Sequence, residues 1–86
     1  MIVSRKLVAE KLSQYLRHEI TLADLVDWAE ESLCHAEFDA QHAGELSQIV
    51  ARLGVADVRA FGLTWEDCET MLRALGYDAK VEVVPV

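Results

Sequence analysis

The clearest helical pattern in the chain runs from Thr21 to Glu37. Its apolar residues recur every three or four positions and form one stripe along a helix that turns by about 100° per residue. The stripe consists of Leu22, Leu25, Val26, Ala29, Leu33 and Ala36. The opposite side carries three carboxylates, a tryptophan and a histidine, namely Asp24, Asp27, Trp28, Glu31 and His35. The pattern predicts an amphipathic helix that buries one face and carries acidic groups around a large aromatic on the other.

Two further helices are predicted on either side of this one. Ser4 is suited to cap a first helix that extends to about His18. Asp39 is suited to cap a third helix, whose apolar stripe ends at Leu53. Gly54 follows directly, at the position where a residue in the left-handed conformation often ends a helix.

The last predicted helix, Trp65–Leu75, has signals at both ends. Thr64 and Asp67 have the spacing of a capping box, with Asp in place of the usual Glu or Gln. Gly76 follows the last apolar residue and is expected to end the helix. The same Thr-x-x-Asp spacing occurs at the start of the central helix. Between the third helix and the last, residues 56–61 are long enough for one or two helical turns.

The C-terminal segment, Tyr77–Val86, changes from helical to alternating periodicity. Its apolar residues alternate with Lys80, Glu82 and Val84 until Pro85, which is typical of a β-strand. Because a single strand cannot satisfy its own backbone groups, it needs a partner. The short apolar start, Met1–Val3, another subunit and a partner protein are the alternatives.

Together these elements predict a mainly α fold: a small bundle of three long helices plus one short helix, with a C-terminal β-strand paired with the N-terminus or with another subunit. Eighty-six residues are the length of one small domain, so residues 1–86 are expected to form a single helical domain. The expected core consists of Leu12, Leu16, Leu25, Val26, Leu33, Leu46, Ile49, Val50, Leu53, Phe61, Trp65, Met71, Leu72 and Leu75.

Charge is distributed unevenly along the chain. Residues 1–17 carry four bases and one acid (+3), residues 18–51 carry eight acids and no Lys or Arg (−8), and residues 52–86 carry four bases and six acids (−2), which sum to −7. An acidic field repels phosphate, so we expect no binding to nucleic acid. It favours encounter with a basic protein surface, although an acidic surface also serves simply to keep a small protein soluble.

Gly54 lies between two predicted helices, an arrangement that invites comparison with a helix-turn-helix. The segment that would have to read the bases, Thr64–Leu75, carries three acids and one base, namely Glu66, Asp67, Glu69 and Arg73. Because this charge is unfavourable beside DNA, the comparison is rejected.

The lack of a recognisable targeting signal, together with the cysteine usage, favours a cytoplasmic protein that does not enter membranes. No apolar run approaches the ~20 residues that span a bilayer. The first residues lack the apolar block of a secretion signal. Cys34 and Cys68 have neither metal-binding nor disulfide-framework spacing, which fits a reducing compartment.

We expect no catalytic activity and no cofactor. The sequence has no Gly-rich phosphate loop and no Ser-His-Asp pattern, and a helical domain of this size leaves little room for a cleft that would separate two carboxylates. Cys34, His35 and His42 are the best candidates for a metal or redox site. Adjacent helical side chains diverge by about 100°, however, so Cys34 and His35 are poorly arranged to share one ion.

Two functional hypotheses are favoured over a metal or redox site. In the first, the chain is an interaction module that neutralises or regulates a basic partner protein through Asp24, Asp27, Trp28, Glu31 and His35. Tryptophan is common among interface hot spots, but Trp28 would also fit a boundary position covered by the first helix or the C-terminal strand. In the second, the chain is a structural homo-oligomer, such as a homodimer, assembled through its terminal strands.

Overall fold

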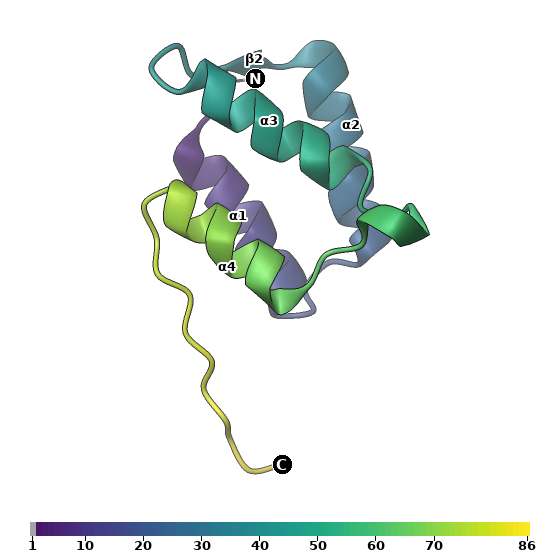
Figure 1. The fold of residues 1–86 in the computed structure, drawn as a ribbon, viewed down its shortest axis with the longest axis vertical. Coiled ribbons are helices and arrows are strands. Elements are labelled where there is room, and N and C mark those ends of the chain that lie inside the picture. The colour runs from purple at the N-terminus through teal and green to yellow at the C-terminus, as the bar shows by residue number, and fades with distance from the viewer. Residues whose placement is uncertain (1) are drawn as a thin grey trace.

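The computed structural model describes residues 2–86 and confirms a mainly α fold (Figure 1). The described residues contain four α-helices, one 3-10 turn and two short strands. The helices are α1 (Arg5–Leu16), α2 (Leu22–His35), α3 (Ala43–Gly54) and α4 (Trp65–Ala74). The 3-10 turn η1 is Arg59–Phe61, and the strands are β1 (Ile2–Val3) and β2 (Glu37–Phe38).

Reciprocal side-chain caps fix the starts of α2 and α4, as the sequence predicts. The Asp24 amide donates to the Thr21 hydroxyl and the Thr21 amide donates to the Asp24 carboxylate, each at 3.1 Å. Thr64 and Asp67 make the same pair of bonds at 3.0 and 3.1 Å. Both capping boxes satisfy amides that the first helical turn would otherwise leave without partners.

Other helix ends differ from the prediction. The central helix ends at His35 and not at Glu37, and Gly54 is the last residue of α3 and not a left-handed residue beyond its end. The first and third helices are each shorter than expected at one end. The first helix ends at Leu16, because His18 adopts a left-handed backbone conformation with φ of 61°. The prediction that Asp39 caps the third helix is wrong. Its carboxylate accepts a hydrogen bond from the Gln41 amide and its carbonyl one from the His42 amide, each at 3.0 Å, so Asp39 starts a turn and the helix begins at Ala43.

The N-terminal strand pairs with an element that sequence reasoning missed. β1 and β2 are parallel, with Ile2 opposite Glu37 and Val3 opposite Phe38. The Asp39 amide extends the pairing by donating to the Val3 carbonyl at 2.9 Å. The Val3 side chain is fully buried. The pairing of Tyr77–Val86 with the N-terminus, one of the expected alternatives, is not formed: β1 pairs with β2, and residues 77–86 form no strand. Met1 lies outside the described residues.

The core lies mainly between α2 and α3, which pack closely along their lengths. The two helices are in contact at Gly54, where an added Cβ atom would lie 3.6 Å from the Leu33 side chain and 3.9 Å from that of Ala29, which is ordinary van der Waals contact. Ser32 of α2 is fully buried. The core is completed by Val3 of β1, by Val8, Ala9 and Leu12 of α1, and by Cys68, Leu72 and Leu75 of the last helical segment. The completely buried large side chains include Leu12, Leu25, Leu46, Leu53, Leu75, Val3, Val8, Val26 and Val50.

Three residues expected in the core are instead exposed. Leu33, Phe61 and Trp65 leave 41%, 51% and 37% of their surface open to solvent. On α2 the buried arc is displaced toward Ser32, so Leu33 falls at its edge. Phe61 lies in a 3-10 turn at the surface, and Trp65 begins α4 beside the C-terminal segment. An apolar stripe wider than the contact it makes leaves its outer members in water.

Among residues 2–86, no helix has the length and apolar character required to cross a membrane.

Candidate protein interaction surfaces

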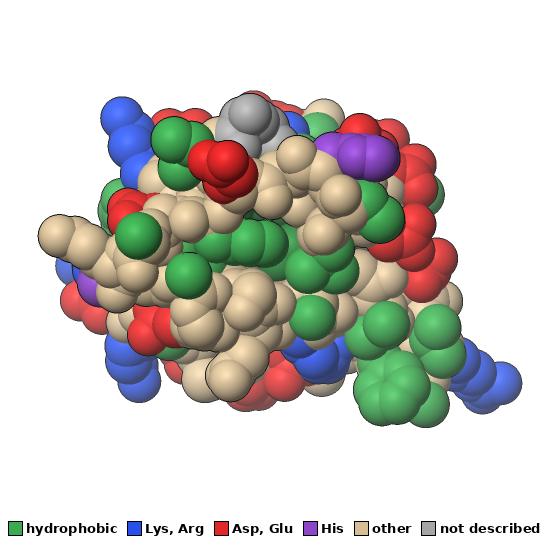
Figure 2. Space-filling model, turned by 90° about the horizontal axis from the view of Figure 1, so that it is seen from above, with side chains coloured by type: hydrophobic (Ala, Val, Ile, Leu, Met, Phe, Trp, Pro, Cys, Tyr) green, Lys and Arg blue, Asp and Glu red, His purple; other side chains and the backbone are tan. Residues whose placement is uncertain are grey.

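The outer side of α2 forms an acidic face with one aromatic residue in it. Asp24, Asp27, Glu31 and His35 are all exposed, as the sequence analysis places them. Glu30 and Glu37 are exposed nearby and add two further carboxylates. Figure 2 shows acidic side chains gathered along one edge of the molecule. We call Asp24, Asp27, Trp28, Glu31 and His35 the α2 face.

Trp28 lies at the border between this face and the core. Its side chain is half-buried and packs against the core cluster. Lys11 of α1 lies above the indole, with its Nζ 5.8 Å from the ring centroid, which is within cation–π range. The indole is therefore partly covered by the first helix, and its remaining surface is what the α2 face offers to a partner.

The carboxylates of the α2 face are largely without basic partners. In the described part of the chain, the one ion pair on this face joins Glu31 to His35, with 3.9 Å between Oε1 and Nε2 and about 70% of each side chain exposed. Such an exposed pair contributes little to stability. The Asp24 carboxylate accepts the hydrogen bond of its capping box. Among the described residues, the Asp27 carboxylate forms no hydrogen bond or ion pair with another side chain. Lys11, over the indole, is the nearby base that the contacts identify, and it forms no ion pair with these carboxylates.

A second surface, which sequence reasoning missed, lies next to the end of α3. Val55, Val58 and Phe61 follow one another at intervals of three residues and are 41%, 48% and 51% exposed. The Val58 amide donates to the Val55 carbonyl at 3.0 Å, and the Phe61 amide to the Val58 carbonyl at 2.8 Å. These two hydrogen bonds fold the segment into consecutive tight turns that keep the three side chains close to one another at the surface. We call these three residues the apolar ridge.

The apolar ridge is held in place by Arg52. Its guanidinium donates to the carbonyls of Phe61 and Gly62 and lies 3.5 Å from the Asp67 carboxylate. These contacts tie the loop between α3 and α4 to both helices. Figure 2 shows apolar side chains exposed together at one corner of the molecule. The signal in the sequence was the i, i+3, i+6 spacing itself, which also fits burial, and Phe61 was expected in the core for that reason.

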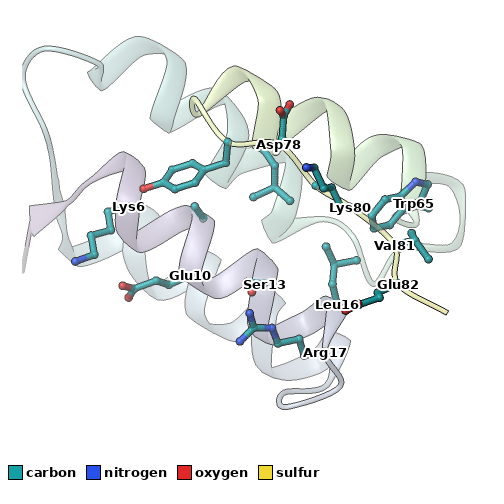
Figure 3. Close-up of a pocket in the computed structure, with 14 residues that line it drawn as sticks. Lys6, Glu10, Ser13, Leu16, Arg17, Trp65, Asp78, Lys80, Val81 and Glu82 are labelled. Atoms are coloured by element: carbon teal, nitrogen blue, oxygen red, sulfur yellow. The ribbon is translucent and has the colours of Figure 1, made fainter. Parts of the chain in front are cut away.

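The third surface is a groove of about 680 Å³ between α1, α4 and the C-terminal segment (Figure 3). The groove is lined by apolar residues of the helices together with Trp65 and Val81. Charged residues of α1 and of the segment also line it: Lys6, Glu10, Arg17, Asp78, Lys80 and Glu82. In the described part of the chain, no ion pair joins the charged residues of α1 to those of the segment.

The C-terminal segment leaves α4 in a direction set by Gly76. The Tyr77 amide donates to the Leu72 carbonyl at 2.9 Å and the Gly76 amide to the Arg73 carbonyl at 3.0 Å, the two bonds of a Schellman motif. Gly76 has φ of 91°, a conformation that other residues rarely adopt. Beyond Tyr77 the chain forms no strand, and Val81, Val83 and Val84 are 68%, 91% and 68% exposed.

The candidate metal ligands do not come together. Within residues 2–86, no three His, Cys, Asp or Glu side chains are grouped to hold a metal ion. Both cysteines are free: Cys34 is exposed and Cys68 is buried. Burial raises the pKa of the Cys68 thiol, and the Asp67 carboxylate adds to this shift, so the thiol stays protonated and acts as a small apolar side chain.

Comparisons of the chain with models of protein families, with curated proteins and with solved structures found no match.

Proposed function

We propose that this chain is a non-catalytic interaction module that binds a basic protein through its α2 face and thereby neutralises or regulates that partner. The observation that carries the proposal is the set of exposed carboxylates around a partly accessible indole, with no Lys or Arg ion-paired to them in the described residues. Complementary charge speeds the encounter of two proteins and fixes their orientation. A tryptophan within such a face supplies apolar contact at its centre.

The surroundings of Trp28 support a basic partner in particular. Lys11 already places its ammonium group over the indole, so the ring accepts a cation in this position. An arginine or lysine of the partner could take this place while other bases meet Asp27 and Glu31. The apolar ridge, Val55, Val58 and Phe61, would extend the contact beyond the charged area.

Affinity purification from the native lysate at low and high salt is the first test. We expect a stoichiometric basic protein that is lost at high salt, because screening weakens exposed charge pairs. The double variant Asp27→Lys/Glu31→Lys should lose this protein. The matched control Glu10→Lys/Glu66→Lys makes the same change in net charge on exposed residues of α1 and α4 and should retain it. Equal loss in both variants would show that net charge, and not the α2 face, decides binding.

Trp28→Ala tests the anchor role. We expect the affinity for the captured partner to fall by about 2 kcal/mol, as is common for an interface anchor. Because Trp28 also contacts the core, circular dichroism must show that the variant is folded at the assay temperature. Unchanged affinity in a folded variant removes Trp28 from the site.

Self-association through the C-terminal segment is a second candidate function. It is favoured by one observation: the valines of the segment are exposed, and its predicted strand has no partner within the described residues of the chain. Static light scattering of the intact chain distinguishes a dimer from a monomer. A stable monomer at high micromolar concentration removes this candidate and leaves the α2 face proposal untouched. We assign either role to the cytoplasm, supported by the two free cysteines.

A further inference from the structure

The C-terminal segment has two chemically different sides when extended. Side chains alternate along a strand, so Ala79, Val81 and Val83 fall on one side and Lys80 and Glu82 on the other. In the structure Ala79 packs against the core cluster, and residues of both sides, Val81 as well as Lys80 and Glu82, line the groove. Val83 continues the apolar side into solvent. Within the described residues, no backbone hydrogen bond satisfies residues 78–86.

The sequence of the segment is complementary to itself in an antiparallel register centred on Val81. If two copies pair with Val81 opposite Val81, Lys80 of each copy lies opposite Glu82 of the other. Ala79 then lies opposite Val83 on the apolar side. Opposite charges and β-branched side chains in facing positions stabilise antiparallel pairs.

The two registers nearest to it, centred on Lys80 and on Glu82, lack this complementarity. A register centred on Ala79 keeps part of it, with Asp78 opposite Lys80 and Tyr77 opposite Val81, and the cross-linking test below distinguishes it from the Val81 register. Centring the pair on Lys80 places two ammonium groups opposite each other, and centring it on Glu82 does the same with two carboxylates. A register whose twofold axis lies between Lys80 and Val81 places Lys80 of one copy opposite Val81 of the other. Each side of the pair then contains both polar and apolar residues. Pro85 has no amide hydrogen and limits the pairing to residues before it.

The groove provides space for the second strand. It adjoins the segment along residues 77–82, and its apolar lining includes Ala9, Leu16 and Leu72 (Figure 3). A neighbouring strand lies about 4.8 Å away in a sheet, with its apolar side facing the same way as that of the first. The valines of the second copy would thus continue the apolar side of the segment across the groove.

We propose that the partner of the C-terminal segment is the same segment of a second copy, paired antiparallel about a twofold axis at Val81, so that the groove beside it becomes part of a homodimer interface. This inference rests on the second candidate function, self-association, and adds its register. It is independent of the α2 face, which lies on a different helix and remains available to a basic partner.

Cysteine cross-linking tests the register directly. In the full chain with Cys34→Ser, which removes the exposed thiol, we introduce Val81→Cys or, as the control, Val84→Cys. The two thiols of the Val81→Cys variant would meet at the axis and form a disulfide-linked dimer under mild oxidation. The two thiols of the Val84→Cys variant would be about 20 Å apart along the strands and should not react with each other. Equal linkage in both variants, or linkage in the Val84→Cys variant alone, overturns the register.

Charge exchange provides a second test that does not depend on thiols. Lys80→Glu and Glu82→Lys should each weaken the homodimer roughly tenfold, since each introduces two like-charge pairs. The double variant Lys80→Glu/Glu82→Lys restores opposite charges and should recover the dimer. An equimolar mixture of the two single variants should form a heterodimer, because one segment then carries two acids and the other two bases.

The outcomes separate the register from self-association. If light scattering finds a dimer, but neither the cysteine variants nor the charge variants behave as expected, self-association is supported and the Val81 axis is overturned. A monomer at high micromolar concentration overturns both, and would mean that the segment remains on its own groove. A dimer that responds to both tests supports the proposed interface.

Discussion

The α2–α3 pair and the C-terminal segment both carry regularly spaced apolar residues, yet only the first has them covered. Leu25, Leu46 and Leu53 are completely buried between the helices, whereas Val81 and Val83 are 68% and 91% exposed. A helix satisfies its backbone internally and needs only an apolar neighbour. A strand needs hydrogen-bond partners as well. The comparison shows that periodicity reveals which side of a segment favours burial, but not what covers it.

The largest expected difference concerns truncation of an apolar side chain in each region. Leu46→Ala should lower the free energy of unfolding by roughly 2–5 kcal/mol, because it leaves a cavity in a packed core. Val83→Ala should change it by less than about 0.5 kcal/mol in the monomer. Urea titration at low protein concentration measures both. A cost for Val83→Ala as large as that for Leu46→Ala would show that the segment is part of the core.

Gly76→Ala should have the next largest effect, since this residue joins α4 to the C-terminal segment. We expect a loss of about 1–2 kcal/mol, because φ of 91° is strained for alanine. In addition, the new Cβ would lie 2.9 Å from the Arg5 guanidinium. Gly44→Ala is the matched control: its Cβ meets nothing within 4 Å in α3, so it should stabilise the protein by up to about 1 kcal/mol. Thermal unfolding of both variants should show shifts of opposite sign.

The start of α4 offers a smaller effect within the helical region. Thr64→Ala removes the hydroxyl that accepts from the Asp67 amide and should cost about 1 kcal/mol. Thr70→Ala, at an exposed position inside the same helix, should be neutral or slightly stabilising because alanine is the better helix former. If chemical denaturation finds the two variants equally stable, the cap contributes nothing.

The smallest expected effect is on the pH dependence of stability. The Thr64 amide and hydroxyl, aided by Arg52, hold the pKa of the Asp67 carboxyl below its ordinary value of 3.8. The unfolded chain therefore binds this proton more readily, and the stabilisation is fully present above pH 3.8 and is lost as the pH falls through the lower folded-state value. Asp67→Asn should flatten the decline in unfolding temperature below about pH 4. A parallel decline in both proteins would exclude a contribution from Asp67.

Local signals allowed much of the fold to be predicted, because their partners lie within a few residues. The Thr-x-x-Asp starts at Thr21 and Thr64 form the expected capping boxes, and Gly76 ends the last helix. Asp39 shows the limit of such reasoning, since the same side chain is equally suited to a turn and to a helix cap. The parallel pairing of β1 with β2 could not be predicted, because two-residue strands have no periodicity.

The sequence predicted which residues form the α2 face, but not how far Trp28 is covered by other elements. The sequence placed Asp24, Asp27, Glu31 and His35 on an exposed side, which the structure shows. It could not decide whether Trp28 is covered, since this depends on Lys11 from another helix. It also assigned Phe61 to the core, because an aromatic at helical spacing is usually buried.

The pairing of β1 with β2 has a consequence for the order of folding. Helices form through contacts between near neighbours in sequence, whereas joining Ile2 to Glu37 closes a loop that contains both α1 and α2. We therefore expect the two strands to associate after the helices and to separate before them. The Asp39 amide, bonded to the Val3 carbonyl, should exchange its hydrogen for deuterium sooner than the Val50 amide inside α3. We expect the N-terminal strand to separate from β2 by local unfolding, while the four helices stay packed.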